Sequence, residues 1–175
     1  MILGLFRKNT ATEAVYAVYR AIVAQSRHPR FYAEWGVPDT ITGRFDMISL
    51  HMALLFRRLR SESKQVRKFS QAIFDLFFKD MDRSLREMGV GDLAIPKKIQ
   101  KMGSIFYGLL TNLNEAMDRN DSAAVEAVLA RNLFEADATA SVSQLADYLF
   151  AEARRLDGQS LDAIVAGRIE LGEAA

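Results

Sequence analysis

Residues that could carry out catalysis are few in this chain of 175 residues, which contains two histidines and no cysteine. His28 precedes a proline and His51 lies within an apolar run, and neither falls in a His-x-x-x-His or Glu-x-x-His arrangement. Those spacings place two ligands on one helical face, so the pattern argues against a zinc hydrolase or a di-iron site. The sequence also lacks a Gly-x-Ser-x-Gly nucleophile elbow and a Gly-x-x-x-x-Gly-Lys phosphate loop. We therefore expect no catalytic residue, no metal and no cofactor, and we do not expect an enzyme.

One acid interrupts an otherwise apolar helical pattern. Apolar residues recur at the three-and-four spacing of a buried face from Phe69 to Phe77, and continuing that spacing from Leu76 reaches Asp80. A lone buried carboxylate is unfavourable, so Asp80 should have a partner, and Arg83 is the nearest cation on the same helix. The pattern leaves two roles open for Asp80, a structural ion pair or a groove that binds a partner. Other helices offer further partners, namely Arg44, His51, Lys97 and Tyr107.

A run of cations occupies the segment "RRLRSESKQVRK", residues 57–68, with Glu62 as its single acid. Such a run is typical of a contact with phosphate on RNA or on anionic lipid. A ribosome and an anionic membrane surface are therefore both candidate partners. A solvated corner between two helices is the other interpretation. No nucleic-acid motif or base-stacking aromatic pattern accompanies the cations, and we expect no DNA binding. The members of this basic surface are Arg57, Arg58, Arg60, Lys64, Arg67 and Lys68.

The net charge of +1 conceals a strong polarity along the chain. Residues 1–111 contain 18 Lys and Arg against 10 Asp and Glu, whereas residues 112–175 contain 5 against 12. Two parts of opposite charge either face each other within one fold or face different partners. The sequence leaves both arrangements open.

Apolar residues at helical spacing recur along the whole chain, without convincing strand alternation. The predicted helices cover about residues 10–28, 44–59, 64–88 and 96–118, with a short helical turn at 31–35. Three more follow Asp121, Ser141 and Ser160, and capping-box spacing sets two starts, at Thr10 with Glu13 and at Ser141 with Gln144. We predict an all-α fold, a single domain over residues 1–175 with six or seven unequal helices. Its acidic C-terminal helices cover about residues 121–170.

No apolar run approaches the roughly 20 residues that a membrane-spanning helix needs. The densest stretch, "FDMISLHMALLF", includes Asp46 and His51. The opening "MILGLFRK" has too short an apolar run for a signal peptide, although it could lie in a membrane interface. We expect a cytoplasmic protein, with the inner face of the cytoplasmic membrane as a second location.

Three segments together resemble a known family. They are "WGVPDTITGRFDMISLHMALLFRRLR", "QAIFDLFFKDMDRSLREMGVGDLAIPKKIQKM" and "IFYG". Over about residues 30–118 they are similar to the bacterial branch of the ubiquinol–cytochrome c chaperone family. The block "DMDRSLREMGVGDLAIPKK" is the most specific part of the resemblance.

The resemblance implies an assembly function without catalysis. Members of the family are understood to bind newly made cytochrome b during biogenesis of the ubiquinol–cytochrome c reductase complex, which is complex III. The resemblance leaves open whether a small helical partner subunit takes part. The candidate partner-binding residues that it implies are Arg44, His51, Asp80, Asp82, Arg86, Asp92, Lys97 and Tyr107.

Two alternative functions remain open. A membrane-surface or lipid-binding adaptor would use the "MILGLFRK" segment and the basic surface. A protein that binds a quinone or another small molecule would need a deep apolar cavity between the predicted helices at 44–59, 64–88 and 96–118.

Overall fold

The structure is a computed structural model that describes residues 2–61, 63–134 and 139–172, and its described side chains exclude residues 2–10, 139 and 140. The side chains of the "MILGLFRK" segment therefore lie outside the described residues. Among the described residues all regular structure is α-helical, which confirms the predicted fold class. Six helices are long and two have five residues each. In chain order they are α1 (Ile2–Ser26), α2 (Pro29–Ala33), α3 (Ile41–Arg58), α4 (Lys64–Glu87), α5 (Ile95–Asp118), α6 (Ser122–Leu133), α7 (Thr139–Asp157) and α8 (Leu161–Val165).

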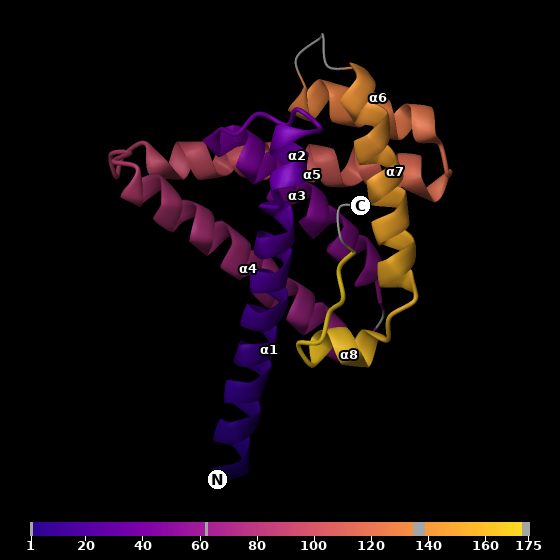
Figure 1. Cartoon of the computed structure of the whole chain (residues 1–175). Helices are drawn as coiled ribbons and strands as arrows, with labels where there is room; N and C mark the ends of the chain where they lie inside the picture. The colour runs from indigo at the N-terminus through magenta and orange to yellow at the C-terminus, as the bar shows by residue number, and fades with distance from the viewer. Residues whose placement is uncertain (1, 62, 135–138, 173–175) are drawn as a thin grey trace.

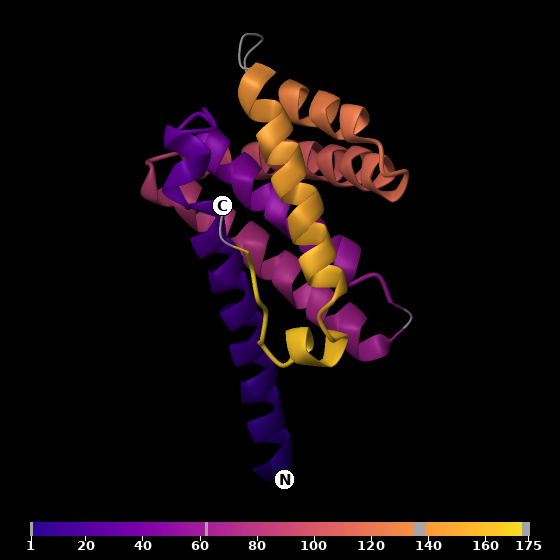
Figure 2. The same cartoon turned by 45° about the vertical axis from the view of Figure 1, so that its right-hand side comes forward.

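Helix α3 lies at the centre of the molecule because it is apolar on two sides. Met47, Leu50 and Leu54 pack into one cluster of buried side chains, shared with α2, α5, α6 and α7. Its other side packs against α1, α4, α5 and α8 through residues such as Met52 and Leu55. Only a narrow polar arc of this helix remains at the surface. Figures 1 and 2 show the result, with α1 and α4 on one side of α3 and α6 and α7 on the other.

Two helix starts predicted from capping boxes are wrong. Helix α1 begins at Ile2, so Thr10 is an interior position and cannot cap it. Helix α7 begins at Thr139, which places Ser141 inside the helix as well. The Asp121 cap is confirmed, since its carboxylate accepts a hydrogen bond from the amide of Ala124 at 2.9 Å. A side-chain cap is typical of a helix start, but its spacing alone also occurs within helices.

Left-handed residues end three of the helices. Gly89 follows α4 with φ +78°; its amide donates to the carbonyl of Arg86 and that of Val90 to the carbonyl of Leu85, at 2.9 and 3.1 Å. This is the Schellman arrangement, in which a residue without a Cβ avoids the strain of positive φ. Asn120 after α5 and Gly167 after α8 have the same pair of bonds. The α4–α5 and α5–α6 turns are therefore defined locally.

The two oppositely charged parts of the chain face each other at one corner. Arg57 at the end of α3 forms ion pairs with Asp118 at 3.2 Å and with Asp157 at 3.0 Å. Arg60 binds the second oxygen of Asp118 at 2.8 Å, and Arg58 donates to the carbonyl of Leu156 at 2.8 Å. Arg57, Arg58 and Arg60 of the predicted basic surface thus make contacts within the protein.

No helix in the described part of the chain is long and apolar enough to cross a membrane.

Candidate partner-binding surface

The best-defined group of predicted site residues lies at the corner where α4 turns into α5. Arg86 in the last turn of α4 forms ion pairs with Asp82, one turn earlier, at 2.7 Å and with Asp92 in the turn at 2.5 Å. The hydrogen bond from Arg86 lowers the pKa of the Asp82 carboxyl below its usual range, so the pair stays ionised. Arg86 therefore fixes the turn to the helix that precedes it.

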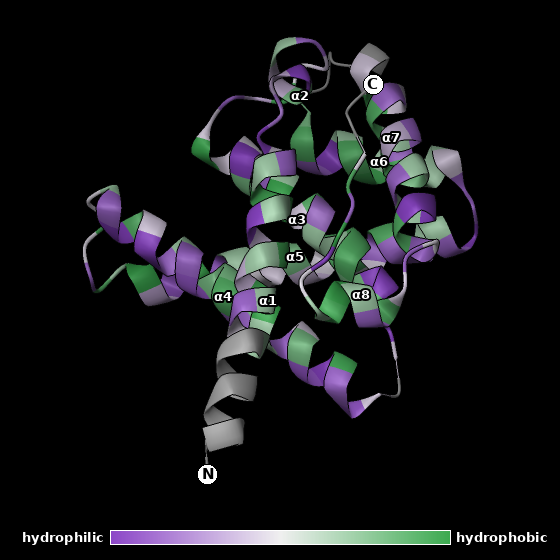
Figure 3. Cartoon of the chain, turned by 60° about the horizontal axis from the view of Figure 1, so that its bottom comes forward, coloured by the Kyte–Doolittle hydropathy of each residue, from purple (hydrophilic) through white to green (hydrophobic). Residues whose placement is uncertain are grey.

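Two exposed apolar side chains occupy the same corner, which we name the α4–α5 corner and define as residues 82–97. Leu93 in the turn is 99% exposed and Met88 at the end of α4 is 42% exposed. Figures 1 and 3 show this corner reaching out from the rest of the molecule. Lys97, in the first turn of α5, is exposed as well. Sequence reasoning missed Met88 and Leu93, although a leucine in a glycine-rich turn is a usable signal.

Tyr107 lies three turns along α5 and belongs to a different surface. Its ring is 54% exposed and packs on Phe74 of α4, with ring centroids 5.8 Å apart. Together with Arg60 and Arg67, these rings line an open pocket of about 500 Å³ between α3, α4 and α5. The structure therefore separates Tyr107 from the α4–α5 corner.

Asp80 does not occupy the apolar core. Met81 takes the buried position in that turn, and the Asp80 side chain keeps 18% of its exposure at the edge of α4 that faces α1. Arg83 pairs with one carboxylate oxygen, as predicted, and the hydroxyl of Tyr19 donates to the other at 2.9 Å. Tyr19 comes from α1 and was absent from the predicted partners. Asp80 thus joins two helices through an ion pair and a hydrogen bond.

His51 lies in the interior, where it is 1% exposed. Its Nδ1 is 2.8 Å from the carbonyl of Met47 and 3.2 Å from the hydroxyl of Ser26, and its Nε2 is 2.8 Å from the hydroxyl of Tyr148 on α7. Burial lowers the pKa of His51 to about 4, which keeps the ring neutral. In this structure the side chain joins α3 to α7 and is out of reach of a partner at the surface.

Arg44 and the remaining cations lie apart from the α4–α5 corner. Arg44 pairs with Asp39 at 2.7 Å across the start of α3, and both side chains are exposed. Lys64 and Lys68 line a groove between α1 and α4. The eight predicted partner-binding residues therefore do not form one site: Asp82, Arg86, Asp92 and Lys97 come together, and the other four are separate.

Comparisons with known proteins give a consistent result. A family model described as Ubiquinol-cytochrome C chaperone matches residues 33–171, which extends well beyond residue 118. The crystal structure of the Cbp3 homolog from Brucella abortus is similar with a TM-score of 0.90 and 40% identity, covering 99% of this chain and 98% of that one. The Xenopus laevis ubiquinol-cytochrome-c reductase complex assembly factor 1 is 22% identical over 146 residues, 82% of this chain and 72% of its own length. The chain belongs to the ubiquinol–cytochrome c chaperone family.

Proposed function

We propose that the protein is an assembly chaperone of the cytochrome bc complex and that it holds newly made cytochrome b, without catalysing a reaction. The family membership and the name of the Xenopus relative as an assembly factor support the process. A membrane subunit that has not yet joined its complex exposes apolar surface, which a chaperone can cover.

The exposed Leu93 is the single observation that favours the α4–α5 corner as the client surface. A fully exposed leucine gains about 1.5–3 kcal/mol when a partner buries it. Leu93 and Met88 flank a turn that Arg86 ties to α4 through Asp82 and Asp92. The corner can therefore present its apolar side chains in a fixed arrangement, which reduces the ordering entropy that binding must overcome. Methionine also adapts readily to irregular apolar surfaces.

A pull-down tests this proposal. Tagged protein is recovered from detergent-solubilised cells of a bacterium that makes a cytochrome bc complex, and the eluate is read by mass spectrometry and by its haem b spectrum. We expect cytochrome b to be enriched over an untagged control, without the mature partner subunits of the complex. No enrichment, even after crosslinking, would contradict the chaperone function.

A matched pair of variants tests the surface separately. Leu93→Ser with Met88→Ser should reduce recovery of cytochrome b by about tenfold or more, because each truncation removes apolar contact area. The control is Ile41→Ser, since Ile41 is 62% exposed but lies at the start of α3. If the double variant recovers as much cytochrome b as the control, the client binds elsewhere on the protein.

The quinone-binding alternative has one observation in its favour. This alternative needs a deep apolar cavity between α3, α4 and α5. The pocket at that place is open, and Phe56, Phe74 and Tyr107 are among its lining residues. Aromatic side chains of this kind can stack on a quinone ring. A rise in melting temperature with a short-chain ubiquinone, lost in Phe74→Ala, would support this function, and an unchanged melting temperature would remove it.

A further inference from the structure

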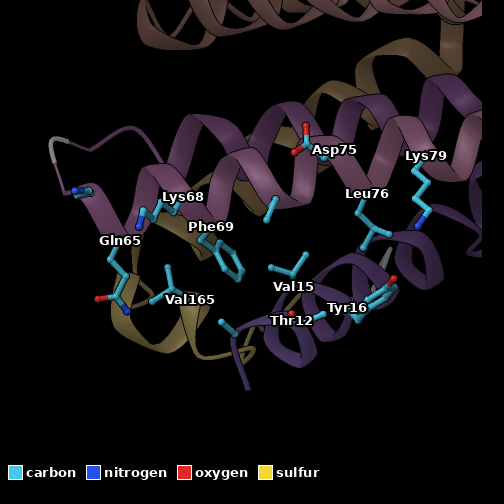
Figure 4. A pocket seen from close by; sticks show the side chains of 13 residues that line it. Thr12, Val15, Tyr16, Gln65, Lys68, Phe69, Asp75, Leu76, Lys79 and Val165 are labelled. Carbon is cyan, nitrogen blue, oxygen red and sulfur yellow. The ribbon is translucent and has the colours of Figure 1, made fainter. Parts of the chain in front are cut away.

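A groove with apolar walls runs between α1 and α4. Its apolar part has a volume of about 770 Å³, within the range of roughly 300–1,000 Å³ that is usual for ligand pockets. Figure 4 shows Val15, Phe69 and Leu76 pointing into the space between the two helices, with Val165 of α8 at one end. Lys68 lies at that end and Lys79 at the other. This part of the groove therefore has apolar walls and a lysine at each end, which suits an apolar chain.

The groove continues past Lys79 into a strongly basic part. A second hollow of about 600 Å³ lies along the same two helices and shares Tyr16, Leu76 and Lys79 with the first. Its cations are Arg20 and Arg27 on α1 together with Lys79 and Arg83 on α4. The apolar part and the basic part therefore adjoin each other along the same two helices, and we name the two together the α1–α4 groove.

The acids of the α1–α4 groove do not neutralise its cations. Asp80 is already bound by Tyr19 and Arg83, and Asp75 accepts a hydrogen bond from Gln71 and points away from the hollow in Figure 4. Within the described part of the chain, five of the groove's cations form no ion pair. These five are Arg20, Arg27, Lys64, Lys68 and Lys79. Together they give the groove a positive potential that favours an anion.

The charge of the groove distinguishes between two possible apolar occupants, a segment of a membrane protein and an anionic phospholipid. Cytoplasmic loops of membrane proteins carry an excess of Lys and Arg, so a groove rimmed by cations repels the regions that flank a membrane helix on that side. Anionic phospholipids combine a phosphate with apolar chains, and each cation near such a headgroup strengthens binding. The observed charge distribution therefore matches a lipid better than it matches a membrane-protein segment.

We propose that the α1–α4 groove binds one anionic phospholipid, with an acyl chain along Val15, Phe69 and Leu76 and the phosphate among Arg20, Arg27 and Lys79. Tyr16, which is 44% exposed, lies between the two parts with a ring for the chain and a hydroxyl for the headgroup. This site is independent of the client proposed for the α4–α5 corner. It would let the protein take a lipid from, or rest on, the membrane into which its client inserts.

Native mass spectrometry with dioctanoyl-phosphatidylglycerol tests the site directly. We expect one bound lipid per protein. Binding should weaken by about tenfold or more when Arg20→Gln, Arg27→Gln and Lys79→Gln are combined. The matched control combines Arg119→Gln, Arg131→Gln and Arg154→Gln, which removes the same charge from exposed positions away from the groove. Equal loss in both triple variants would show a non-specific charge effect and overturn the proposal.

Two further arms separate the chain from the headgroup. Ala72→Trp fills the apolar part without changing charge and should abolish lipid binding, while circular dichroism checks that the variant is folded. Glycerol 1-phosphate at the same concentration should not compete, because it lacks the acyl chain. If it displaces the lipid fully, the site is a phosphate site and the lipid assignment is wrong. The variant combining Arg20→Gln, Arg27→Gln and Lys79→Gln should recover as much cytochrome b as the wild type, because the client is proposed to bind at the α4–α5 corner.

Discussion

The hydroxyl of Tyr148 lies 2.8 Å from Nε2 of His51, although the two residues are 97 positions apart. Nδ1 of His51 is equally close to the carbonyl of Met47, which can only accept, so Nδ1 carries the ring proton. Nε2 is then the acceptor and Tyr148 donates to it. Tyr148 in turn accepts from the side-chain amide of Gln25 at 2.8 Å, which also donates to the carbonyl of Gly172. One chain of hydrogen bonds thus connects α3, α7, α1 and the C-terminal segment, which runs back past α7 in Figure 2.

Replacing Tyr148 with phenylalanine should destabilise the protein by about 1–3 kcal/mol, because it leaves the buried Nε2 of His51 without a donor. The amide of Gln25 would lose an acceptor in the same step. Chemical denaturation by urea, followed by circular dichroism, measures the change. Tyr107→Phe is the control, since Tyr107 is 54% exposed and should change stability very little. Equal stability of both variants and the wild type would mean that the hydrogen-bond chain contributes nothing.

His51 and Asp46 should make opposite contributions to the pH dependence of stability. The pKa of His51 falls from 6.5 to about 4 on burial, so below pH 6.5 the unfolded chain binds the proton first and His51 destabilises the fold as pH falls. Burial raises the pKa of Asp46 from 3.8 to about 7, and its contribution is full below pH 3.8 and is lost as pH rises to about 7. Between pH 4 and 6.5 the two slopes, each about 1.4 kcal/mol per pH unit, nearly cancel.

The variant Asp46→Asn separates the two groups. The substitution removes the carboxyl whose protonation stabilises the folded protein as pH falls. The stability of the variant should therefore fall as the pH is lowered from 6.5 to 4.5, whereas that of the wild type changes less. At pH 8 the same variant should be more stable than the wild type, because the folded wild type must then hold a buried charge. Urea denaturation at pH 4.5, 5.5, 6.5 and 8 measures both effects. Parallel stability curves for the two proteins would show that Asp46 titrates normally.

Helical periodicity predicts most of the fold because burial here follows local spacing. The long helices, the two-sided burial of α3 and the Gly89 turn all follow from apolar positions and from residues with special backbone preferences. The candidate site is harder to predict. A step of four residues from Leu76 predicts Asp80 as the next buried position, and the same step from Phe77 predicts Met81. Only the packing of α1 against α4 decides which of the two side chains is buried. Likewise, no local pattern pairs His51 with Tyr148.

The α4–α5 turn should depend on the backbone of Gly89 and not on space around it. A Cβ at Gly89 would meet nothing within 4 Å, yet φ is +78°, so Gly89→Ala should cost about 1–2 kcal/mol through strain alone. Gly91 also has open space around it but lacks a positive φ, which makes Gly91→Ala the matched control. Thermal denaturation of the two variants compares them. Equal melting temperatures would mean that the turn adopts another conformation, and the proposed presentation of Leu93 would then lose its basis.

Tyr19 and Asp80 should be energetically coupled because their hydrogen bond joins α1 to α4. Tyr19 is 5% exposed, and burial together with the neighbouring Asp80 carboxylate raises the pKa of its hydroxyl, so it stays protonated and donates. A double-mutant cycle of Tyr19→Phe and Asp80→Asn should give a coupling free energy of about 0.5–1.5 kcal/mol by urea denaturation. Tyr19→Phe with Asp82→Asn should give none, since Asp82 binds Arg86.

Asp80→Asn should leave cytochrome b recovery unchanged, because Asp80 lies along the α1–α4 groove and not at the α4–α5 corner. If recovery falls while stability and coupling do not change, Asp80 contacts the client itself and the corner is not the whole client surface.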